Sequence, residues 1–394
     1  MLNMIASRLL ANVVAKFKAP AGTRENSPVP TSQPSAGAPG TADGVPLNEI
    51  VNALYAGILE RDPEPAGFDA CLDSLRNGTS LAAAIRGMIA SDEFQHRLPT
   101  SLESTVVLPD LTKLYPDKYS VNEAGLVIYS APADRDFDFM ESLIIKHRYY
   151  DSLGAWAPKI DLDKRVTAAI VQGLGASSCL ELGCFTGPVL SLLAEQGLEV
   201  CGVEISHLAF LLAYPNIHEH IRYGRLPDLH FDRRYDVVLG MDILEHLNPL
   251  SLDTYIERIV DLLEPQGFLY INSPMHGEDD VFGQLFKVYL PQWRQAGNDV
   301  FWRQMHCDEK GWPLHGHLVW AHPQWWESVF RKHGLVRDRE IERGMHGLLA
   351  PFFEKYAPAR RSFFVLRRAE FEPDISGTKQ RLQAAIAPLV AELQ

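Results

Sequence analysis

Residues Ser178-Cys-Leu-Glu-Leu-Gly-Cys-Phe-Thr-Gly-Pro188 have the pattern of a strand, a tight turn and the start of a helix. The apolar run ends at Gly183, and Gly187 and Pro188 precede an apolar segment with helical spacing. Proline suits the first turn of a helix, because its missing N–H costs little there. Glycines at such a turn let the backbone and the helix N-terminus approach a ligand closely. The stretch therefore predicts a ligand-binding turn at the end of a buried strand.

A second predicted strand follows the helix and ends on an acid. Residues 198–204 are mostly apolar, and Glu204 stands 21 residues after Gly183. In a doubly wound sheet, an acid at about this spacing reaches the ribose hydroxyls of a bound nucleotide. The glycines are spaced G-x-x-x-G, however, and not G-x-G-x-x-G as in dinucleotide-binding proteins. The spacing therefore argues against a nicotinamide dinucleotide.

Later segments continue the alternation of strands and helices. Further strands are expected at residues 220–226, 235–240, 267–274, 335–341 and 362–366. This alternation predicts a parallel α/β sheet that binds its ligands at the carboxyl ends of the strands. Gly183, Glu204, Asp242 and Ser273 all fall at those ends, which predicts a single site there.

The pattern Glu181-x-Gly183-x-x-x-Gly187, with Glu204 downstream, resembles motif I and the following acid of class I S-adenosylmethionine-dependent methyltransferases. Residues Met241-Asp-Ile-Leu-Glu-His-Leu247 also match the D-x-x-E-H-L signature of many small-molecule methyltransferases. The resemblance covers residues 150–368 and implies an α/β Rossmann-like fold with a doubly wound, mostly parallel seven-stranded sheet. It implies S-adenosyl-L-methionine as the cofactor. The residues implied at the cofactor are Glu181, Gly183, Cys184, Gly187, Glu204, Ile205, Asp228 and Asp242.

Three segments precede the catalytic domain. Residues 1–18 lack acids and carry apolar side chains at helical spacing, which predicts an amphipathic helix on a membrane surface or a partner protein. Residues 19–45 are rich in Pro, Gly and Ser and predict a disordered linker. Residues 46–98 predict a small all-α module of three helices. The string Leu-Tyr-x-x-Ile-Leu-x-Arg-Asp-Pro-x-x-x-Gly over residues 54–67 resembles the DUF4214 family, common in bacterial surface and glycan-related proteins, which has no established chemistry.

The methyltransferase domain is expected at residues 160–368, between a connector at 99–159 and a helical tail at 369–394. By resemblance, the connector folds over the cofactor. Its aromatic residues either shield the cofactor or pack on the sheet; they are Tyr149, Tyr150 and Trp156. Residues 275–321 form an insertion rich in Trp and His, which is expected to line the acceptor pocket or to form a capping subdomain.

Histidines supply the catalytic candidates. Methyl transfer needs proximity and alignment, and a hydroxyl acceptor also benefits from a base, for which histidine is the usual residue at neutral pH. The candidates are His246, His315 and His317. Asp242, Glu245 and His246 also resemble the metal-binding set of some ubiquinone-pathway O-methyltransferases. Three ligands without a clear fourth make a poor site, so we expect no metal and expect Glu245 and His246 to orient a helix.

Composition and charge narrow the function. A net charge of −13 argues against a nucleic-acid partner, because binding phosphates needs clustered Lys and Arg. No apolar run is long enough to predict a membrane span. The five cysteines form no C-x-x-C pair, which favours a reducing cytoplasm. Peripheral contact with the inner membrane or with a protein, through residues 1–18 and the helical module, stays open.

We therefore expect a cytoplasmic bacterial methyltransferase that O-methylates a sugar or glycan precursor in surface polysaccharide biosynthesis. The acceptor class is inferred from the DUF4214-like module and from the aromatic insertion, since aromatic faces suit sugar rings. Two alternatives are open. One is a methyltransferase for another small molecule, and the other is a cofactor-binding scaffold that recruits a glycan-synthesis assembly.

Overall fold

The computed structural model describes residues 41–42, 45–59, 61–79, 81, 84, 87–88, 91, 101–102, 106–122, 125–156, 159–285 and 303–393. The chain divides into two compact units, Met1–Thr100 and Ser101–Gln394, and each is described by itself. Three predicted features lie outside the described residues: the helix at 1–18, most of the linker at 19–45, and positions 286–302 of the insertion.

The described part of the first unit contains two helices that share a small core. Its elements are β1 (Thr41–Ala42), β2 (Val45–Pro46), α2 (Leu47–Ile58) and α3 (Pro65–Arg76). Val51, Leu54 and Tyr55 of α2 are buried in one cluster with Leu72 of α3. The helical spacing of these apolar residues is what the sequence predicts for the module. The third predicted helix lies mostly outside the described residues.

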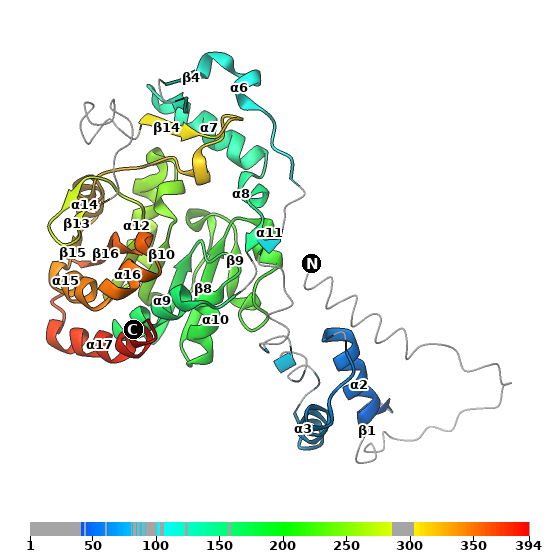
Figure 1. Ribbon diagram of the computed structural model, residues 1–394. Coiled ribbons are helices and arrows are strands. Elements are labelled where there is room, and N and C mark those ends of the chain that lie inside the picture. Colours follow the sequence, from blue (N-terminus) through cyan, green and yellow to red (C-terminus); the bar gives the residue numbers. More distant parts are fainter. Residues whose placement is uncertain are drawn as a thin grey trace. The chain divides into compact units, whose positions relative to one another are not determined.

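The second unit is built on a seven-stranded sheet with the order β15-β16-β11-β10-β7-β8-β9 (Figure 1). The strands are β7 (Ser178–Leu182), β8 (Glu199–Glu204), β9 (Ile221–Tyr223), β10 (Tyr235–Met241), β11 (Leu263–Asn272), β15 (Leu335–Arg337) and β16 (Phe363–Arg368). Strands β7 to β11 are parallel, and β16 runs antiparallel to both β11 and β15. The predicted doubly wound, mostly parallel sheet is confirmed.

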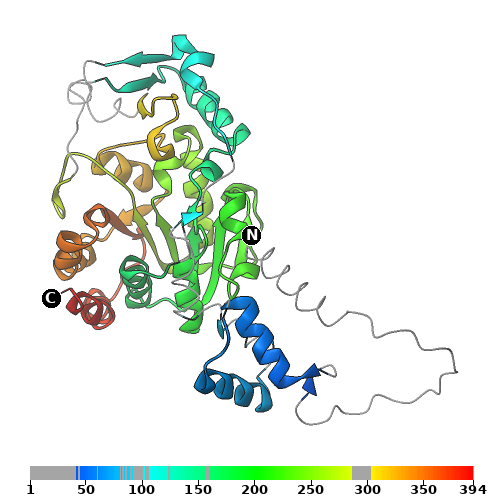
Figure 2. The same cartoon turned by 45° about the vertical axis from the view of Figure 1, so that its right-hand side comes forward.

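Helices cover both faces of this sheet (Figures 1 and 2). They are α9 (Leu162–Gly173), α10 (Pro188–Glu195), α11 (His207–Leu211), α12 (Leu252–Leu262), α14 (Pro323–Lys332), α15 (Arg339–Leu348), α16 (Ala350–Lys355) and α17 (Ile375–Ala391). The tail helix α17 packs on α9 so closely that a Cβ on Gly173 would lie 2.7 Å from the Cα of Leu382. Leu382, Ile386 and Val390 are buried, so the tail belongs to the domain core.

The strand predicted at residues 335–341 is shorter than expected. It ends at Arg337, because the side chain of Asp338 accepts a hydrogen bond from the backbone N–H of Ile341 and caps α15. An acidic N-cap satisfies a helix N–H that has no partner within the helix. The prediction was therefore wrong for its last four positions, which begin a helix.

Two segments far apart in the sequence form one cap, defined here as residues 106–154 and 303–318. Its elements are α6 (Leu111–Leu114), β4 (Tyr119–Val121), β5 (Val127–Ser130), α7 (Asp134–Lys146), α8 (Tyr149–Ser152), β14 (Gln304–Cys307) and η7 (Leu314–Gly316). Strand β14, from the insertion, pairs with β5 from the connector. Tyr129, Phe137, Met140 and Trp312 form the centre of a separate hydrophobic core. The connector and the end of the insertion are thus one structural unit (Figure 2).

Four short strands complete the described strands of the second unit. They are β3 (Ser101–Leu102), β6 (Ala155–Trp156), β12 (Glu278–Asp279) and β13 (Gly283–Gln284). Strand β3 pairs with β6, and β12 pairs with β13. The hairpin β12–β13 is tied to β15 by Arg337, whose guanidinium donates to Asp279 at 2.6 Å. This ion pair fixes the beginning of the insertion to the edge of the main sheet.

Candidate active site

The glycine-rich turn follows β7 and needs both of its glycines. Gly183 has φ 62° and Gly187 has φ 77°, in the left-handed region that side chains disfavour. A Cβ on Gly183 would lie 2.7 Å from Ile243, and one on Gly187 would lie 2.4 Å from Ile217. Gly187 is also the residue from which α10 begins. Conformation and packing together therefore exclude larger residues at both positions.

The carboxylate of Glu204, at the end of β8, is held by backbone groups. It accepts the N–H groups of Phe185 (2.8 Å), Ile205 (2.7 Å) and Ser206 (2.6 Å). Burial raises the pKa of Glu204, and these three hydrogen bonds oppose that rise. Each carboxylate oxygen can accept about two hydrogen bonds, so the oxygen bonded only to Phe185 keeps acceptor capacity for a ligand hydroxyl. The predicted acid is thus fixed beside the glycine turn.

Glu181 and Cys184 lie below the same turn. The Oε2 atom of Glu181 is buried and has no hydrogen-bond partner among the described residues. Burial, with the nearby charge of Glu204, raises the pKa of Glu181 to about 8. The Cys184 side chain packs so tightly on β8 that a Cβ on Gly202 would lie 2.6 Å from its sulfur. Cys184 therefore faces the core, and its contribution to a ligand site is limited to its backbone.

Apolar and acidic side chains surround the ends of β8 and β9. Ile205 is 43% exposed and Tyr223 is 49% exposed, although both are large hydrophobic residues. The ring of Tyr223 lies 5.5 Å from that of Phe210. Asp228, in the short helix η3 (Leu226–Asp228), is exposed. Exposed apolar faces beside a ribose-binding acid suit a flat base such as adenine.

The residues between Glu181 and Asp228 therefore fit S-adenosylmethionine. The buried, unpartnered oxygen of Glu181 is an acceptor that a ligand ammonium group can satisfy. Glu204 offers a carboxylate to ribose hydroxyls, and the glycine turn is tied directly to it by the N–H of Phe185. Asp242, by contrast, turns its carboxylate to the guanidinium of Arg360. Its predicted role at the cofactor stays a prediction, and this ion pair was missed by sequence reasoning.

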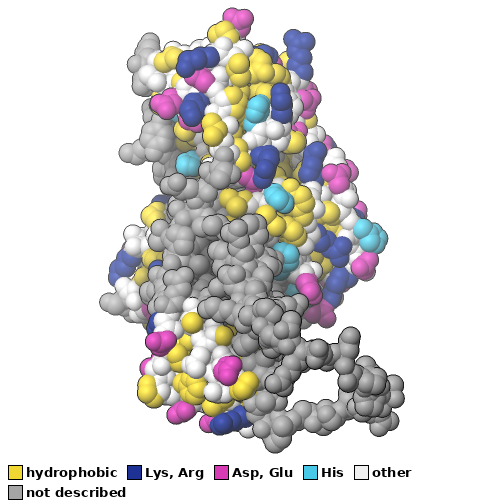
Figure 3. Space-filling model, turned by 90° about the vertical axis from the view of Figure 1, so that its right-hand side faces the viewer, with side chains coloured by type: hydrophobic (Ala, Val, Ile, Leu, Met, Phe, Trp, Pro, Cys, Tyr) yellow, Lys and Arg dark blue, Asp and Glu magenta, His cyan; other side chains and the backbone are white. Residues whose placement is uncertain are grey.

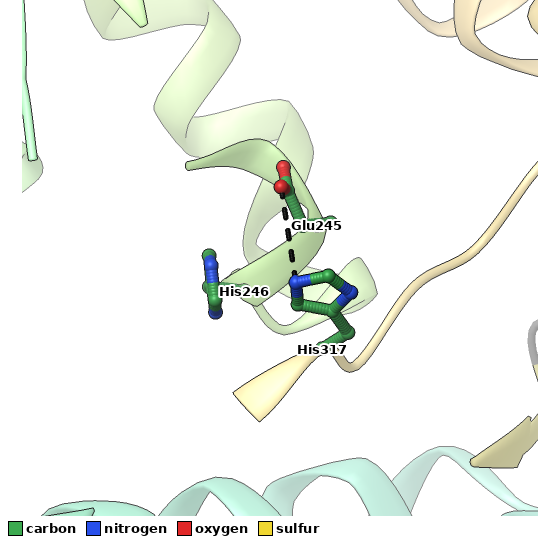
Figure 4. Close-up of side chains that lie close together, drawn as sticks. All are labelled: Glu245, His246 and His317. Carbon is green, nitrogen blue, oxygen red and sulfur yellow. Dashed lines mark ion pairs between the residues drawn. The ribbon is translucent and has the colours of Figure 1, made fainter. Parts of the chain in front are cut away.

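An acceptor-side cluster lies just after β10 (Figure 4). Glu245 and His246 belong to the short helix η4 (Leu244–His246), and His317 comes from the cap. One ligand atom from each of the three lies within 4.8 Å of the others. Glu245 and His317 point toward one another, with 4.0 Å between Oε1 and Nε2. The ring centroids of His246 and His317 are 4.8 Å apart.

Burial sets the protonation of this cluster. It lowers the pKa of His246 to about 4 and that of His317 to about 2, so both imidazoles are neutral at neutral pH. Burial, followed by the charge of Asp242, raises the pKa of Glu245 well above its usual range. Ser273 donates to Oε2 of Glu245 at 3.0 Å, whereas Oε1 has no hydrogen-bond partner among the described residues. The Nδ1 atom of His246 is likewise buried without one.

The cap holds this cluster through aromatic residues. Tyr149 donates to the carbonyl of Pro313 at 2.8 Å, and Tyr150 lies edge-on to His246 at 5.5 Å between ring centroids. A Cβ on Gly316 would lie 2.9 Å from both tyrosine rings, and Gly316 has φ 80°. The tyrosines therefore pack between the cap and His246, and their predicted role as a shield over the cofactor stays a prediction. The side chain of Trp156 is outside the described residues.

The cap is also tied to the cofactor side by Asp151, at the end of α8. Its carboxylate accepts the hydroxyl of Ser206 at 2.7 Å and the N–H of Leu208 at 3.1 Å. Ser206 in turn belongs to the loop that wraps Glu204. Sequence reasoning missed Asp151, because an acid in a short helix has no motif that marks it.

The structure separates the three predicted catalytic histidines. His246 and His317 meet at Glu245, whereas His315 is exposed and has φ 57°. The ring of His315 lies 5.6 Å from that of His317. Glu245 was assigned only to orienting a helix, although the D-x-x-E-H-L signature contains it. The arrangement offers a neutral imidazole beside a buried carboxyl group, which can accept and hold a proton.

Comparison with known proteins gives two family matches. Residues 151–337 match the methyltransferase domain family, and residues 42–98 match the domain of unknown function DUF4214. An uncharacterized methyltransferase of Staphylococcus carnosus is 26% identical over 29% of this chain and 55% of its own length. A ubiquinone biosynthesis O-methyltransferase of Rickettsia bellii is 26% identical over 24% of this chain and 40% of its own length. The chain thus spans about half the length of these curated relatives.

One solved structure similar to this chain is a Burkholderia thailandensis 1,6-didemethyltoxoflavin-N1-methyltransferase with bound S-adenosylhomocysteine. It is 17% identical, with a TM-score of 0.35, and the match covers 64% of this chain and all of that one. Motif, sheet order and family match agree. Residues 151–337 belong to the class I S-adenosylmethionine-dependent methyltransferase family, whose cofactor is S-adenosylmethionine, and residues 42–98 belong to the DUF4214 family.

Proposed function

We propose that this protein transfers the methyl group of S-adenosylmethionine to a hydroxyl oxygen of a sugar or glycan precursor. The observation that carries the proposal is the meeting of Glu245, His246 and His317 at the carboxyl end of β10. When bound, the cofactor supplies an electrophilic methyl group on a sulfonium. The chain then has to orient the acceptor oxygen and remove its proton.

His317 is the base in this proposal. Its side chain is 28% exposed, so an acceptor can reach it, and its imidazole is neutral at neutral pH. Methyl transfer would break the bond between the sulfonium sulfur and the methyl carbon as the acceptor oxygen binds that carbon, and Nε2 of His317 would take the proton that the acceptor hydroxyl loses. The carboxyl group of Glu245 lies 4.0 Å from that nitrogen and would orient the imidazole. Ser273 keeps Glu245 in place.

The acceptor class is supported by composition more than by contacts. Tyr150, which is only partly buried, lies beside His246 of the cluster, and aromatic faces suit the apolar faces of sugar rings. The DUF4214 module at residues 42–98 is a second reason to look among glycans. A nitrogen or oxygen of another small molecule is the alternative, since one solved neighbour is an N1-methyltransferase by name.

Two expectations about partners and location stay proposals. On the face drawn in Figure 3, acidic and basic side chains are interspersed over the described residues, which supports a partner other than nucleic acid. Among the described residues, no helix combines the length and the apolar character that crossing a membrane requires. We place the protein in the cytoplasm, with residues 1–18 and the helical module as its contacts to a membrane or protein.

The test is a panel of nucleotide sugars and lipid-linked glycans, with release of S-adenosylhomocysteine as the readout. We expect turnover with at least one saccharide acceptor and none in its absence. A parallel panel of phenols and amines covers the alternative. Turnover only in the second panel would contradict the acceptor class, and cofactor binding without turnover in either would favour the scaffold.

A further inference from the structure

Arg360 lies at the active-site edge of the sheet although it is remote in sequence. It belongs to the short helix η8 (Pro358–Arg361), which directly precedes β16. Because β16 runs antiparallel to β11, its beginning lies beside the carboxyl ends of β10 and β11. Only 19% of the Arg360 side chain is exposed.

The guanidinium of Arg360 joins three elements. It donates to Asp242 after β10, to Oδ1 of Asn272 at the end of β11 (2.7 Å), and to both oxygens of Asp163 in α9. Three bonds reach Asp163: Nε donates to both of its oxygens, at 3.0 and 3.2 Å, and Nη2 donates to Oδ2 at 3.0 Å. A planar guanidinium can make all of these bonds at once, which a lysine ammonium cannot do in the same geometry.

The turn that Arg360 holds has contacts on both halves of the site. Asp242 adopts φ 51°, which is unusual for a residue other than glycine, and its N–H donates to the carbonyl of Asn272 at 2.9 Å. The next residue, Ile243, packs on Gly183 of the cofactor turn. Glu245 and His246 follow within one turn of helix. A small rotation at Asp242 would therefore move the acceptor cluster relative to the cofactor turn.

We propose that Arg360 is a positioning residue for methyl transfer, which sets the Asp242–Ile243 turn and through it the place of Glu245. The inference rests on the proposed function for its kinetic consequence. Misplacing a reacting group by about 1 Å can cost about a hundredfold in rate. Among the described residues, no hydrogen bond or ion pair joins Arg360 to the acceptor-side imidazoles. Its charge also acts on Glu245 by opposing the rise that burial causes in the pKa of that carboxyl group, and a variant that keeps the charge separates this direct effect from the effect on the turn.

The experiment compares Arg360→Gln and Arg360→Lys with Arg368→Gln in the full chain. Arg368 is the last residue of β16 and lies at the opposite end of that strand from Arg360. It donates to the backbone carbonyls of Val260 and Leu263, so it controls for the loss of a structural arginine. We expect kcat to fall about thirtyfold to a hundredfold for Arg360→Gln and at least tenfold for Arg360→Lys, against less than threefold for the control. Full rescue by lysine would show that charge alone matters and would overturn the proposal.

Two further readouts separate positioning from general stability. In a Glu245→Gln background, adding Arg360→Gln should change kcat by less than threefold, because the group that it positions is already altered. Multiplicative losses would overturn the proposal. Amide hydrogen exchange of residues 242–247 should accelerate in Arg360→Gln and not in the control. Unchanged exchange would overturn the proposal, and this measurement needs no assay of methyl transfer. A wild-type protein that methylates nothing would instead refute the proposed function.

Discussion

The two halves of the site hold a buried carboxyl group in opposite ways. On the cofactor half, Glu204 accepts three backbone N–H groups from its own loop and the glycine turn. On the acceptor half, Glu245 accepts one hydrogen bond, from the hydroxyl of Ser273, and its other oxygen has no hydrogen-bond partner among the described residues. Backbone groups give the first half a geometry that side-chain changes barely alter. The second half depends on side chains from distant segments, so substitutions there should affect the chemical step.

The largest expected effect is the loss of kcat when the acceptor half is altered. His317→Ala removes the proposed base and should lower kcat by about 10² to 10⁴, the usual contribution of general base catalysis. The dissociation constant for S-adenosylmethionine should stay within about threefold, because the cofactor half is held by backbone. His315→Ala is the matched control, since His315 is exposed and two positions away. Equal losses in both variants would point to a packing role for this segment.

The next largest effect is the loss of cofactor affinity when the cofactor half is altered. Glu204→Ala should weaken S-adenosylmethionine binding by about 1.5 to 3 kcal/mol, the usual loss for hydrogen bonds to a charged group. Titration calorimetry measures it, with Glu199→Ala at the other end of β8 as the control. An unchanged affinity would remove Glu204 from the site.

A smaller effect is expected in the pH dependence of kcat, which tests whether the base on the acceptor half is buried. The imidazole must be neutral to accept a proton, and burial lowers the pKa of His317 to about 2 and that of His246 to about 4. Protonation therefore begins only as the pH falls toward those values, and kcat at saturating substrates should be flat between pH of about 6 and about 9. An acid limb centred near 6.5, where an exposed histidine titrates, would mean that the base is not buried.

The smallest effect concerns the first unit. A fragment of residues 101–394 contains the whole second unit, so it should fold and bind S-adenosylmethionine within about threefold of the full chain. Circular dichroism and calorimetry check both points. An insoluble fragment from a soluble full chain would show that the helical module is part of the catalytic core.

The cofactor half was predictable because its parts are close in sequence. Glu181, Gly183 and Glu204 lie within 24 positions, and strand period and glycine spacing mark them directly. The parallel α/β class of the fold followed from the alternation of strands and helices. The strand at 335–341 was overextended because the capping role of Asp338 shows only in the folded chain.

The acceptor half was predictable only as a set of candidates. Strand β14 reaches the cap by pairing with β5, which is about 175 positions earlier, and no local pattern announces such a pairing. The sequence gives no reason to prefer His317 over His315 as the base. The left-handed backbone at His315 and Gly316 places the two side chains differently. Arg360 is 118 positions from Asp242, so their ion pair needed the fold.

The most direct test of the central claim follows the methyl group itself. The full chain is incubated with S-adenosylmethionine labelled with ¹³C in its methyl group and with the acceptor found in the saccharide panel, and the product is examined by ¹³C–¹H NMR. The account predicts an O-methyl resonance on the sugar, with one equivalent of S-adenosylhomocysteine per methyl group transferred. A labelled methyl group on nitrogen or carbon, or release of S-adenosylhomocysteine without a labelled product, would contradict it.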